Sequence, residues 1–351
     1  MIRVVVDDSA LVRGVLTELI NRSPDLRVIG QAADPYEARE KIRELDPDVI
    51  TLDVEMPRMD GLAFLERIMR LRPMPVVMIS TLTERGAQTT LRALELGAVD
   101  FVAKPTLNVR AGLDELAREI TGKLRTAAQA RVGRRTATVA ALDAPPAAKP
   151  SAAGQAVAGD RIIAIGASTG GTEAIREILT ALPADLPGIV ITQHMPAGFT
   201  ASFAARLDQL SRLHVKEAAD GDRILQGHAY VAPGGRHLAI ERSAMGGYVA
   251  RVRDGEPVNR HKPSVDVLFR SVARWAGARA TGVMLTGMGA DGALAMREMR
   301  DHGAFNLVQD EASCVVFGMP REAIAAGAAD EVLPLAAMAQ RLAARLGPAA
   351  H

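Results

Sequence analysis

The 351-residue sequence contains little cysteine and few aromatic residues, and both shortages exclude classes of function. Cys314 is the single cysteine, so the chain can form neither an internal disulfide nor a cysteine cluster around a metal ion. Phenylalanine, tryptophan and tyrosine together make up 3% of the residues, which argues against a surface that stacks nucleic-acid bases. The chemistry must therefore come from other side chains.

The sequence also lacks an excess of charge and a long apolar run. Lysine and arginine number 42 against 41 acidic residues, a net charge of +1, which gives no electrostatic reason to expect a nucleic acid as partner. No run approaches the length of a membrane-spanning helix, and the first residues lack the apolar core of a secretory signal. We therefore expect a cytoplasmic protein of two domains that does not insert into a membrane.

Residues 1–122 alternate short apolar strands with helical patterns. The predicted strands are Ile2–Val6, Leu26–Ala32, Val49–Leu52, Pro75–Ile79 and Phe101–Ala103. The predicted helices are Ala10–Asn21, Pro35–Leu45, Leu62–Leu71 and Arg85–Leu96. Such alternation indicates a parallel sheet covered by helices on both faces, with function at the carboxyl ends of its strands.

These strand ends carry polar side chains. They are Asp7 and Asp8 after the first strand, Asp53 after the third, Ser80 and Thr81 after the fourth, and Lys104 after the fifth. Three carboxylates at one edge repel one another unless a hard cation such as Mg²⁺ neutralises them. A lysine and a hydroxyl beside them suit phosphoryl oxygens, and a carboxylate can accept the phosphoryl group. Each aspartate alone reads as a helix cap, but the set favours phosphoryl transfer.

With Leu52-Asp-Val-Glu-Met-Pro57, Ile79-Ser-Thr81 and Phe101-Val-Ala-Lys-Pro105, this segment resembles the receiver domains of two-component systems. The resemblance implies a flavodoxin-like, five-stranded parallel fold, with Asp53 as the phospho-acceptor. It implies Mg²⁺ bound by Asp8, Asp53 and the backbone carbonyl of Glu55, with Asp7 assisting through water. It also implies that Lys104 and Ser80, or the adjacent Thr81, contact the phosphoryl group and that Phe101 is the switch aromatic.

Residues 123–159 read as an interdomain linker. Periodicity fades from about Ala127, and alanine, proline, glycine, serine and threonine dominate. This composition predicts an extended tether with a helical first part. Its few arginines and lysines are expected to be solvated rather than to grip a partner.

In the second domain, residues 160–347, an apolar run at Ile162–Ile165 ends in the glycine-rich turn Gly166–Gly171, and a helical pattern follows at once. This strand-turn-helix pattern lifts Ser168 clear of the sheet at the positive end of a helix. The turn is compatible with a phosphate cradle, with an exposed nucleophilic serine, or with an ordinary turn in which the serine caps the helix.

Two further predicted strands end in His194 and Asp291. Serine, histidine and a carboxylate are the groups that acyl transfer needs as nucleophile, base and orienting acid. Their order differs from the usual serine, acid, histidine order of α/β-hydrolases with a G-x-S-x-G turn. The residues alone leave His261 open as a rival base and Asp310-Glu311 as a rival acid. Alternating runs at Tyr230–Ala232, His237–Glu241 and Tyr248–Val252 suggest an inserted hairpin region.

The segments Gly166–Gly171, Gln193–Pro196, Asn259–Asp266 and Leu285–Gly292, following a receiver-like domain, resemble the CheB family of chemotaxis receptor methylesterases. The resemblance implies a doubly wound, Rossmann-like α/β catalytic domain with an inserted β-hairpin, and no cofactor for the esterase reaction. It implies the triad Ser168, His194 and Asp291. It further implies that Thr169 and His261 line the pocket and that Met288 contributes a backbone oxyanion donor.

The same resemblance implies a phosphorylation-activated hydrolase that demethylates glutamate γ-methyl esters on chemoreceptors and deamidates receptor glutamines. Its partners would be the methylated cytoplasmic domain of a chemoreceptor and a histidine kinase as phosphodonor, with the enzyme acting as a monomer. The receiver would cover the active site until it is phosphorylated. A DNA-binding output domain is disfavoured because no helix-turn-helix pattern is present. A dinucleotide site is disfavoured because His194, not an acid, ends the second strand.

Overall fold

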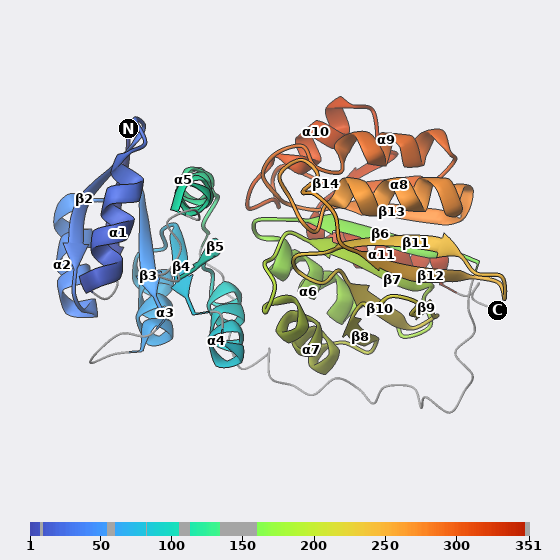
Figure 1. Cartoon of the computed structure of the whole chain (residues 1–351), viewed down its shortest axis with the longest axis horizontal. Coiled ribbons are helices and arrows are strands. Elements are labelled where there is room, and N and C mark those ends of the chain that lie inside the picture. The colour runs from blue at the N-terminus through green and yellow to red at the C-terminus, as the bar shows by residue number, and fades with distance from the viewer. Residues whose placement is uncertain (8–9, 55–59, 82, 105–112, 134–159, 348–351) are drawn as a thin grey trace. The chain divides into compact units, whose positions relative to one another are not determined.

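The computed structural model describes residues 1–7, 10–54, 60–81, 83–104, 113–133 and 160–347. The chain divides into two compact units, Met1–Ala137 and Thr138–His351 (Figure 1). Each unit builds its own sheet and core, so each is treated separately below. Among the described residues, no helix combines the length and the apolar character that crossing a membrane requires.

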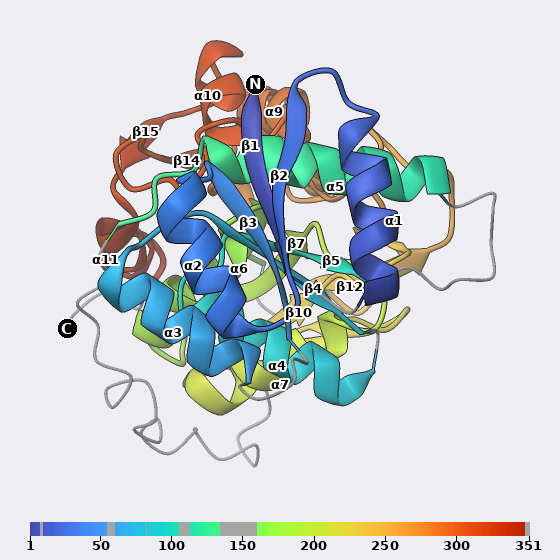
Figure 2. The ribbon, with the colours of Figure 1, turned by 90° about the vertical axis from the view of Figure 1, so that its left-hand side faces the viewer.

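The first unit is a five-stranded parallel sheet with the strand order β2-β1-β3-β4-β5. The strands are β1 (Ile2–Asp7), β2 (Leu26–Ala32), β3 (Val49–Asp53), β4 (Val76–Ser80) and β5 (Asp100–Ala103). The helices are α1 (Ala10–Asn21), α2 (Pro35–Leu45), α3 (Gly61–Leu71), α4 (Glu84–Glu95) and α5 (Leu113–Ala128). Helices α1 and α5 cover one face and α2, α3 and α4 the other (Figure 2). The expected receiver-like fold is confirmed.

Helix boundaries in this unit follow local chemistry. The carboxylate of Asp34 accepts the backbone N–H groups of Tyr36 and Glu37 and so caps α2, whose first residue is Pro35. The last helix, α5, was not predicted as a separate element, and it continues to Ala128. Residues 123–128, expected as the helical start of a linker, therefore belong to a helix that packs against the sheet through buried Ile120, Leu124 and Ala127.

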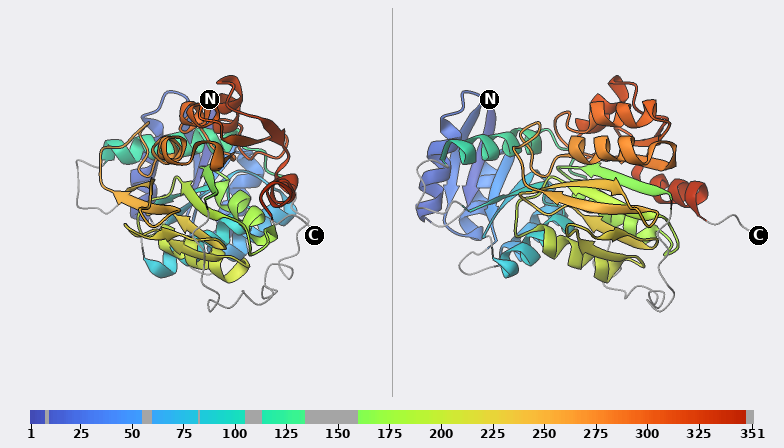
Figure 3. Two further views of the ribbon diagram at one scale, coloured as in Figure 1. Left: turned by 90° about the vertical axis from the view of Figure 1, so that its right-hand side faces the viewer. Right: turned by 45° about the vertical axis from the view of Figure 1, so that its right-hand side comes forward.

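The second unit is built on a seven-stranded parallel sheet with the order β15-β14-β13-β6-β7-β10-β8. Its strands are β6 (Ile162–Ala167), β7 (Gly188–Gln193), β8 (His214–Glu217), β10 (His228–Val231), β13 (Ala280–Met284), β14 (Phe305–Gln309) and β15 (Glu331–Leu333). Its helices are α6 (Gly171–Ala181), α7 (Thr200–Leu210), α8 (Val265–Trp275), α9 (Ala293–Asp301), α10 (Met319–Ala325) and α11 (Leu335–Leu346). Helices α8, α9 and α10 lie on one face and α6, α7 and α11 on the other (Figures 1 and 3). The doubly wound fold is confirmed.

The order of the strands reverses beside β6. From β6 the chain adds β7 on one side and later returns to place β13 on the other. In open α/β sheets such a reversal leaves a crevice at the carboxyl ends of the two central strands, where ligands bind. Ile162, Ile163, Ala164 and Ile165 on β6 are fully buried, which explains why this strand reads as a continuous apolar run.

The expected hairpin is present, with one correction. Strands β11 (His237–Arg242) and β12 (Tyr248–Arg253) pair antiparallel, and β9 (Arg223–Ile224) adds a third strand to this small sheet. Tyr230–Ala232, which the sequence placed in the same hairpin region, instead begins within β10 of the main parallel sheet. Short alternating runs do not distinguish a short strand of a large sheet from a strand of a small one.

Candidate active site and phosphoryl-acceptor site

Ser168 lies directly after β6, in the turn that leads into α6. Its backbone N–H donates to the carbonyl of Thr286 at 3.0 Å, and its carbonyl accepts the N–H of Gly171 at 2.7 Å. Gly287 packs so closely on the turn that a Cβ there would come within 2.8 Å of Ser168 Cβ. The loop after β13 and the start of α6 therefore fix the backbone of a half-buried serine at the sheet reversal.

His194 follows β7 at the neighbouring strand end. Its backbone N–H donates to the carbonyl of Ala167 at 3.1 Å, so the histidine and Ser168 occupy adjacent positions on adjacent strands. The buried side chain of Gln193 strengthens this arrangement, because its Nε2 donates to the carbonyls of both Ser168 (2.9 Å) and His194 (3.3 Å). One amide thus joins the backbone of both residues.

Asp291 comes from the loop between β13 and α9 and is 2% exposed, so it needs internal partners. Its Oδ2 lies 2.8 Å from His194 Nε2 and accepts the N–H of Val265 at 2.7 Å. Its Oδ1 accepts the hydroxyl of Ser264 at 2.8 Å and the amide of Asn259 at 2.7 Å. Both oxygens of this carboxylate are therefore held in place.

A second buried carboxylate, Asp266, supports the first. Asn259 Nδ2 also donates to Asp266 Oδ2 at 2.8 Å, so a single amide bridges the two acids. The backbone N–H of Gly292, next to Asp291, donates to Asp266 Oδ1 at 3.0 Å, while Asp266 N–H points at Asp291 Oδ1 from 3.4 Å. Each aspartate thus accepts a backbone N–H from beside the other, at the starts of α8 and α9.

The ionised state of Asp291 fixes the tautomer of His194. Burial alone would raise the pKa of Asp291, but hydrogen bonding and attraction to His194, with the bonds from Asn259 and Ser264, hold it well below its ordinary value. A carboxylate can only accept hydrogen bonds, so His194 Nε2 carries the hydrogen between them. In the neutral imidazole, Nδ1 is then the basic nitrogen. It is buried, and no described residue hydrogen-bonds to it.

Of the other predicted site residues, His261 contacts this pair directly. His261 stacks on His194 with ring centroids 3.7 Å apart and the planes 11° from parallel. Thr169 is buried, and its carbonyl accepts the hydroxyl of Thr286 at 3.1 Å. Met288 follows Gly287 and is 46% exposed. The rival acid Asp310 instead accepts the N–H and hydroxyl of Ser313, at 3.0 and 2.6 Å.

In the first unit, the carboxylate of Asp53 is buried at the end of β3. Lys104 Nζ donates to its Oδ2 at 2.6 Å. The predicted hydroxyls differ in surroundings. Ser80 is fully buried and donates to the carbonyl of Gly86 at 3.2 Å, whereas Thr81 is half-buried with its hydroxyl 3.2 Å from that of Thr83. Strand pairing sets the backbone of Asp7 beside Leu52, next to Asp53.

Asp8, Glu55 and the side chain of Asp7, three of the expected Mg²⁺ ligands, lie outside the described part of the chain. Phe101 is buried, 4% exposed, and Lys123 Nζ lies 4.9 Å from the centre of its ring. The same Nζ forms ion pairs of 3.2 Å with Asp100 and Glu119. Phe101, the predicted switch aromatic, is therefore buried, and the ion-paired Lys123 lies over its ring.

The sequence did not single out Gln193, Asn259 or Asp266 as functional, although each lies in a segment quoted for the family resemblance. A signal existed for Gln193, because it directly precedes His194 at the end of an apolar strand. Asn259 gave a weaker signal. It lies in a loop at a positive φ of 52°, a conformation that asparagine tolerates better than most residues.

Comparisons with known proteins agree on both units. Residues 163–342 match the family model described as CheB methylesterase, and residues 4–113 match the response regulator receiver domain. A relative from Albidiferax ferrireducens, named protein-glutamate methylesterase/protein-glutamine glutaminase 1, is 64% identical, with 99% of this chain and 94% of the relative covered. A relative with the same two activities in its name, from Nitrosomonas europaea, is 59% identical over 97% of this chain and 95% of its own. The crystal structure of the Thermotoga maritima CheB methylesterase catalytic domain matches 53% of this chain and 98% of its own, with 38% identity and a TM-score of 0.51.

Proposed function

Because the chain belongs to the CheB methylesterase family and carries a receiver domain, we propose that it is a phosphorylation-activated protein-glutamate methylesterase and protein-glutamine glutaminase. Its substrate is a glutamate γ-methyl ester, or a glutamine, on the cytoplasmic domain of a chemoreceptor, and a histidine kinase supplies the phosphoryl group. The observation that carries the proposal is the 2.8 Å bond between Asp291 and His194 at the strand end next to Ser168.

In the first half of the reaction, Ser168 Oγ attacks the ester carbonyl while His194 Nδ1 removes its proton. Nδ1 is the free nitrogen because Nε2 is bound to Asp291. As the ring becomes an imidazolium, the ionised Asp291 stabilises it. The tetrahedral intermediate collapses when His194 returns the proton to the leaving oxygen, which releases methanol and leaves a glutamyl-enzyme.

Water completes the cycle by the reverse proton transfers. It attacks the acyl-enzyme as His194 takes one of its protons, and His194 returns that proton to Ser168 Oγ as the acyl bond breaks. The glutamic acid formed then loses its own proton to solvent. A glutamine substrate follows the same path with ammonia as the leaving group. The oxyanion would be bound by backbone donors near Thr169 and Met288, on the two loops that meet at Ser168, and the start of α6 adds its positive dipole end.

His261 has a supporting role in this scheme. His194 Nε2 donates to Asp291, and this bond, which fixes the tautomer of the ring, favours His194 over the stacked His261 as the base. The ring of His261 stacks on that of His194 at 3.7 Å, and this contact limits rotation of the His194 ring while Nε2 stays bonded to Asp291. We therefore assign His261 to positioning the base and lining the pocket.

Regulation is assigned to the first unit, where Asp53 is the phospho-acceptor. The residues fit a Mg²⁺ ion, because Asp53 offers a buried carboxylate at a sheet edge and β1 brings Asp7 alongside. Asp7, Asp8, Asp53 and the carbonyl of Glu55 would hold the ion. When bound, Mg²⁺ neutralises charge on the phosphoryl group as it is transferred. Lys104 already contacts the acceptor carboxylate, and it would bind a phosphoryl oxygen after transfer.

The proposed function is tested by measuring methanol release from a methylated receptor fragment. We expect release to require the enzyme and to increase several-fold when a small phosphodonor and Mg²⁺ are added. Ammonia release from the unmodified, glutamine-containing fragment measures the second activity in the same reaction vessel. If neither product forms with phosphorylated enzyme, the proposed function is wrong.

Replacing Asn259 with alanine should reduce kcat about 10- to 100-fold, because a hydrogen bond to a charged group contributes roughly 1.5–3 kcal/mol. The variant loses the amide that bridges Asp266 and Asp291, and we expect KM to change little. Asn259→Asp should lose more activity, since it sets a third carboxylate beside the other two. The prediction is checked by steady-state kinetics, with circular dichroism to confirm that the variant folds. An unchanged kcat in Asn259→Ala would mean that Ser264 and the backbone of α8 hold Asp291 without the help of Asn259.

A further inference from the structure

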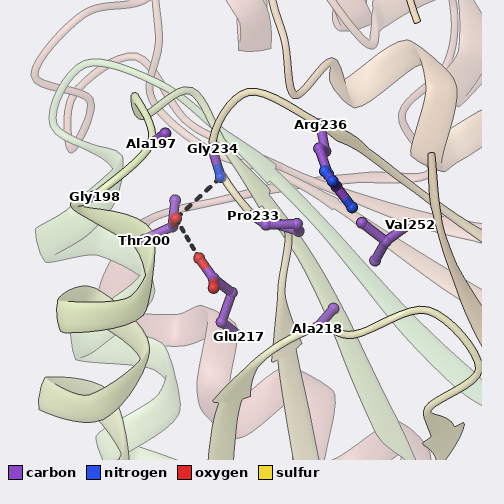
Figure 4. A pocket seen from close by; sticks show the side chains of 9 residues that line it. All are labelled: Ala197, Gly198, Thr200, Glu217, Ala218, Pro233, Gly234, Arg236 and Val252. Carbon is purple, nitrogen blue, oxygen red and sulfur yellow. Dashed lines mark hydrogen bonds between the residues drawn. The ribbon is translucent and has the colours of Figure 1, made fainter. Parts of the chain in front are cut away.

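A pocket of 320 Å³ opens at the carboxyl edge of the main sheet, beside the proposed active site. Its walls come from the start of α7, from the residues that follow β8 and β10, and from β12 (Figure 4). We call it the Arg236 pocket, after the cation in its wall. Thr200, Glu217 and Gly234 supply its other polar atoms.

The Arg236 pocket is lined by the loop after His194 and is joined by a backbone hydrogen bond to the loop that carries His261. Gly234 lies against the chain after His194 so closely that a Cβ there would come within 2.3 Å of Ala197 N. The next residue, Gly235, donates its N–H to the carbonyl of Lys262 at 3.2 Å, in the loop that carries Asn259 and His261. A substrate segment seated over Ser168 would therefore extend over this pocket.

Two opposite charges face the space from opposite sides (Figure 4). The carboxylate of Glu217 is fixed by the hydroxyl of buried Thr200, which in turn accepts the N–H of Gly234 at 3.0 Å. Only Oε1 is used in that bond, which leaves Oε2 as an acceptor.

Arg236 is exposed. The pKa of the exposed Asp254 is lowered mainly by Lys262 and by the N–H of Gly255, and the charge of Arg236 helps to lower it. The guanidinium of Arg236 forms no hydrogen bond or close ion pair with any residue that the structure describes, so its N–H groups can donate to a ligand.

We propose that the Arg236 pocket binds the primary carboxamide of a second side chain of the substrate, a glutamine near the one that reacts. This inference rests on the proposed function, which makes glutamines part of the substrate. A carboxamide carries its acceptor oxygen and its donor nitrogen on separate atoms, so it can accept a hydrogen bond from a guanidinium on one side and donate one to a carboxylate on the other, whereas a hydroxyl has only one oxygen for both bonds. It satisfies Arg236 and Glu217 at once and brings no charge of its own.

The alternatives for the same position fit less well. A glutamate would attract Arg236 but would face the fixed carboxylate of Glu217 across a small space. A γ-methyl ester accepts a hydrogen bond from Arg236 but has no N–H for Glu217. The pocket therefore favours segments whose second site is still an amide, and the enzyme's own deamidation of that site would weaken later binding.

The test uses peptides with one glutamyl γ-methyl ester and a second residue, glutamine, glutamate or leucine, placed three, four or seven residues away. Methanol release gives kcat/KM for the full-length, phosphorylated enzyme and for Arg236→Ala, Glu217→Gln and Arg212→Ala. Arg212→Ala is the matched control, because it removes an exposed arginine just ahead of β8, at the opposite end of that strand. Glu217→Gln keeps an acceptor for Thr200, so it should fold.

At one spacing we expect the wild type to favour glutamine about tenfold over leucine, and to favour glutamine over glutamate. Arg236→Ala should lose the preference for glutamine, and Arg212→Ala should keep it. Glu217→Gln should raise the rate on the glutamate peptide to at least that on the glutamine peptide, since the repelling charge is gone. Equal rates on all peptides, a wild-type preference for glutamate, or an Arg236→Ala variant that keeps its selectivity would each overturn the proposal.

Failure of the proposed function would be seen separately, as no methanol from any peptide. The pocket can then be tested alone by titrating the labelled peptides into Ser168→Ala and following fluorescence polarisation. Tighter binding of the glutamine peptide than of the leucine peptide supports the carboxamide site, and equal binding rejects it.

Discussion

Ser168→Ala is expected to reduce kcat for methyl-ester hydrolysis by about 10⁵-fold while the protein keeps its fold. The hydroxyl is the only group removed, and the contacts that shape the turn come from the backbone of residue 168, which bonds to Thr286, Gly171 and Gln193. Alanine preserves all three. Without the nucleophile, the base and its acid have no group to activate, and the residual rate reflects substrate binding and the oxyanion donors alone.

The measurement is methanol release under saturating substrate, with thermal melting as the test of folding. Ser243→Ala, in the turn between β11 and β12, is the matched control and should retain full activity. A serine-directed acylating probe should label the wild type at Ser168 and leave the variant unlabelled, as read by mass spectrometry. A Ser168→Ala enzyme with more than about a tenth of the wild-type kcat would remove this residue from the mechanism.

Asp53→Asn is expected to abolish stimulation by a phosphodonor, leaving the full-length enzyme at its unstimulated rate. Asparagine has nearly the same shape but cannot form an acyl phosphate, and it replaces a buried carboxylate that Lys104 contacts at 2.6 Å. Asp48→Asn is the control. It changes an aspartate of the same unit that pairs with Arg3 near the start of β3, so it should leave stimulation intact.

The same assay asks how the receiver controls the esterase. A tethered inhibitor acts at a high effective concentration, so removing residues 1–150 should raise the rate above that of the unphosphorylated whole. If the shortened enzyme is no faster, the receiver activates the esterase directly or recruits a partner. If Asp53→Asn still responds to the phosphodonor, another residue accepts the phosphoryl group.

The elements that the sequence predicted well are those with strong local patterns. In the first unit the helix Pro35–Leu45 was predicted from its periodicity with the bounds that the structure gives it, and the cap by Asp34 and the proline at its first position agree with that start. Helix α5 was not recognised, since the segment before it, residues 105–112, gave no clear helix start. The pairing of β10 with β7 and β8 could not be predicted from a four-residue strand, because pairing depends on partners distant in the sequence.

At the site, the sequence indicated which side chains could react but not how they are arranged. Ser168, His194 and Asp291 became candidates because each follows an apolar run in a parallel α/β pattern. The resemblance to the CheB family, not the pattern, favoured them over the rival base and the rival acid. The sequence does not indicate which nitrogen of His194 faces Asp291. The orientation depends on the position of the Asp291 carboxylate, which is held by the first residue of α8, and that position is set only by folding. The amide of Asn259 likewise acquires its two carboxylate partners only through folding, 7 and 32 residues away along the chain.

The exchange of backbone bonds between Asp266 and Asp291 links catalysis to the integrity of one helical layer. The carboxylate that orients the base is also the group that satisfies the first N–H of α8, and its partner does the same beside α9. Fraying of either helix start would therefore release the proposed acid of the triad even while the sheet remained intact. If Asp291 is the acid that orients the base, heating should therefore abolish activity as soon as the starts of α8 and α9 loosen, before the sheet unfolds.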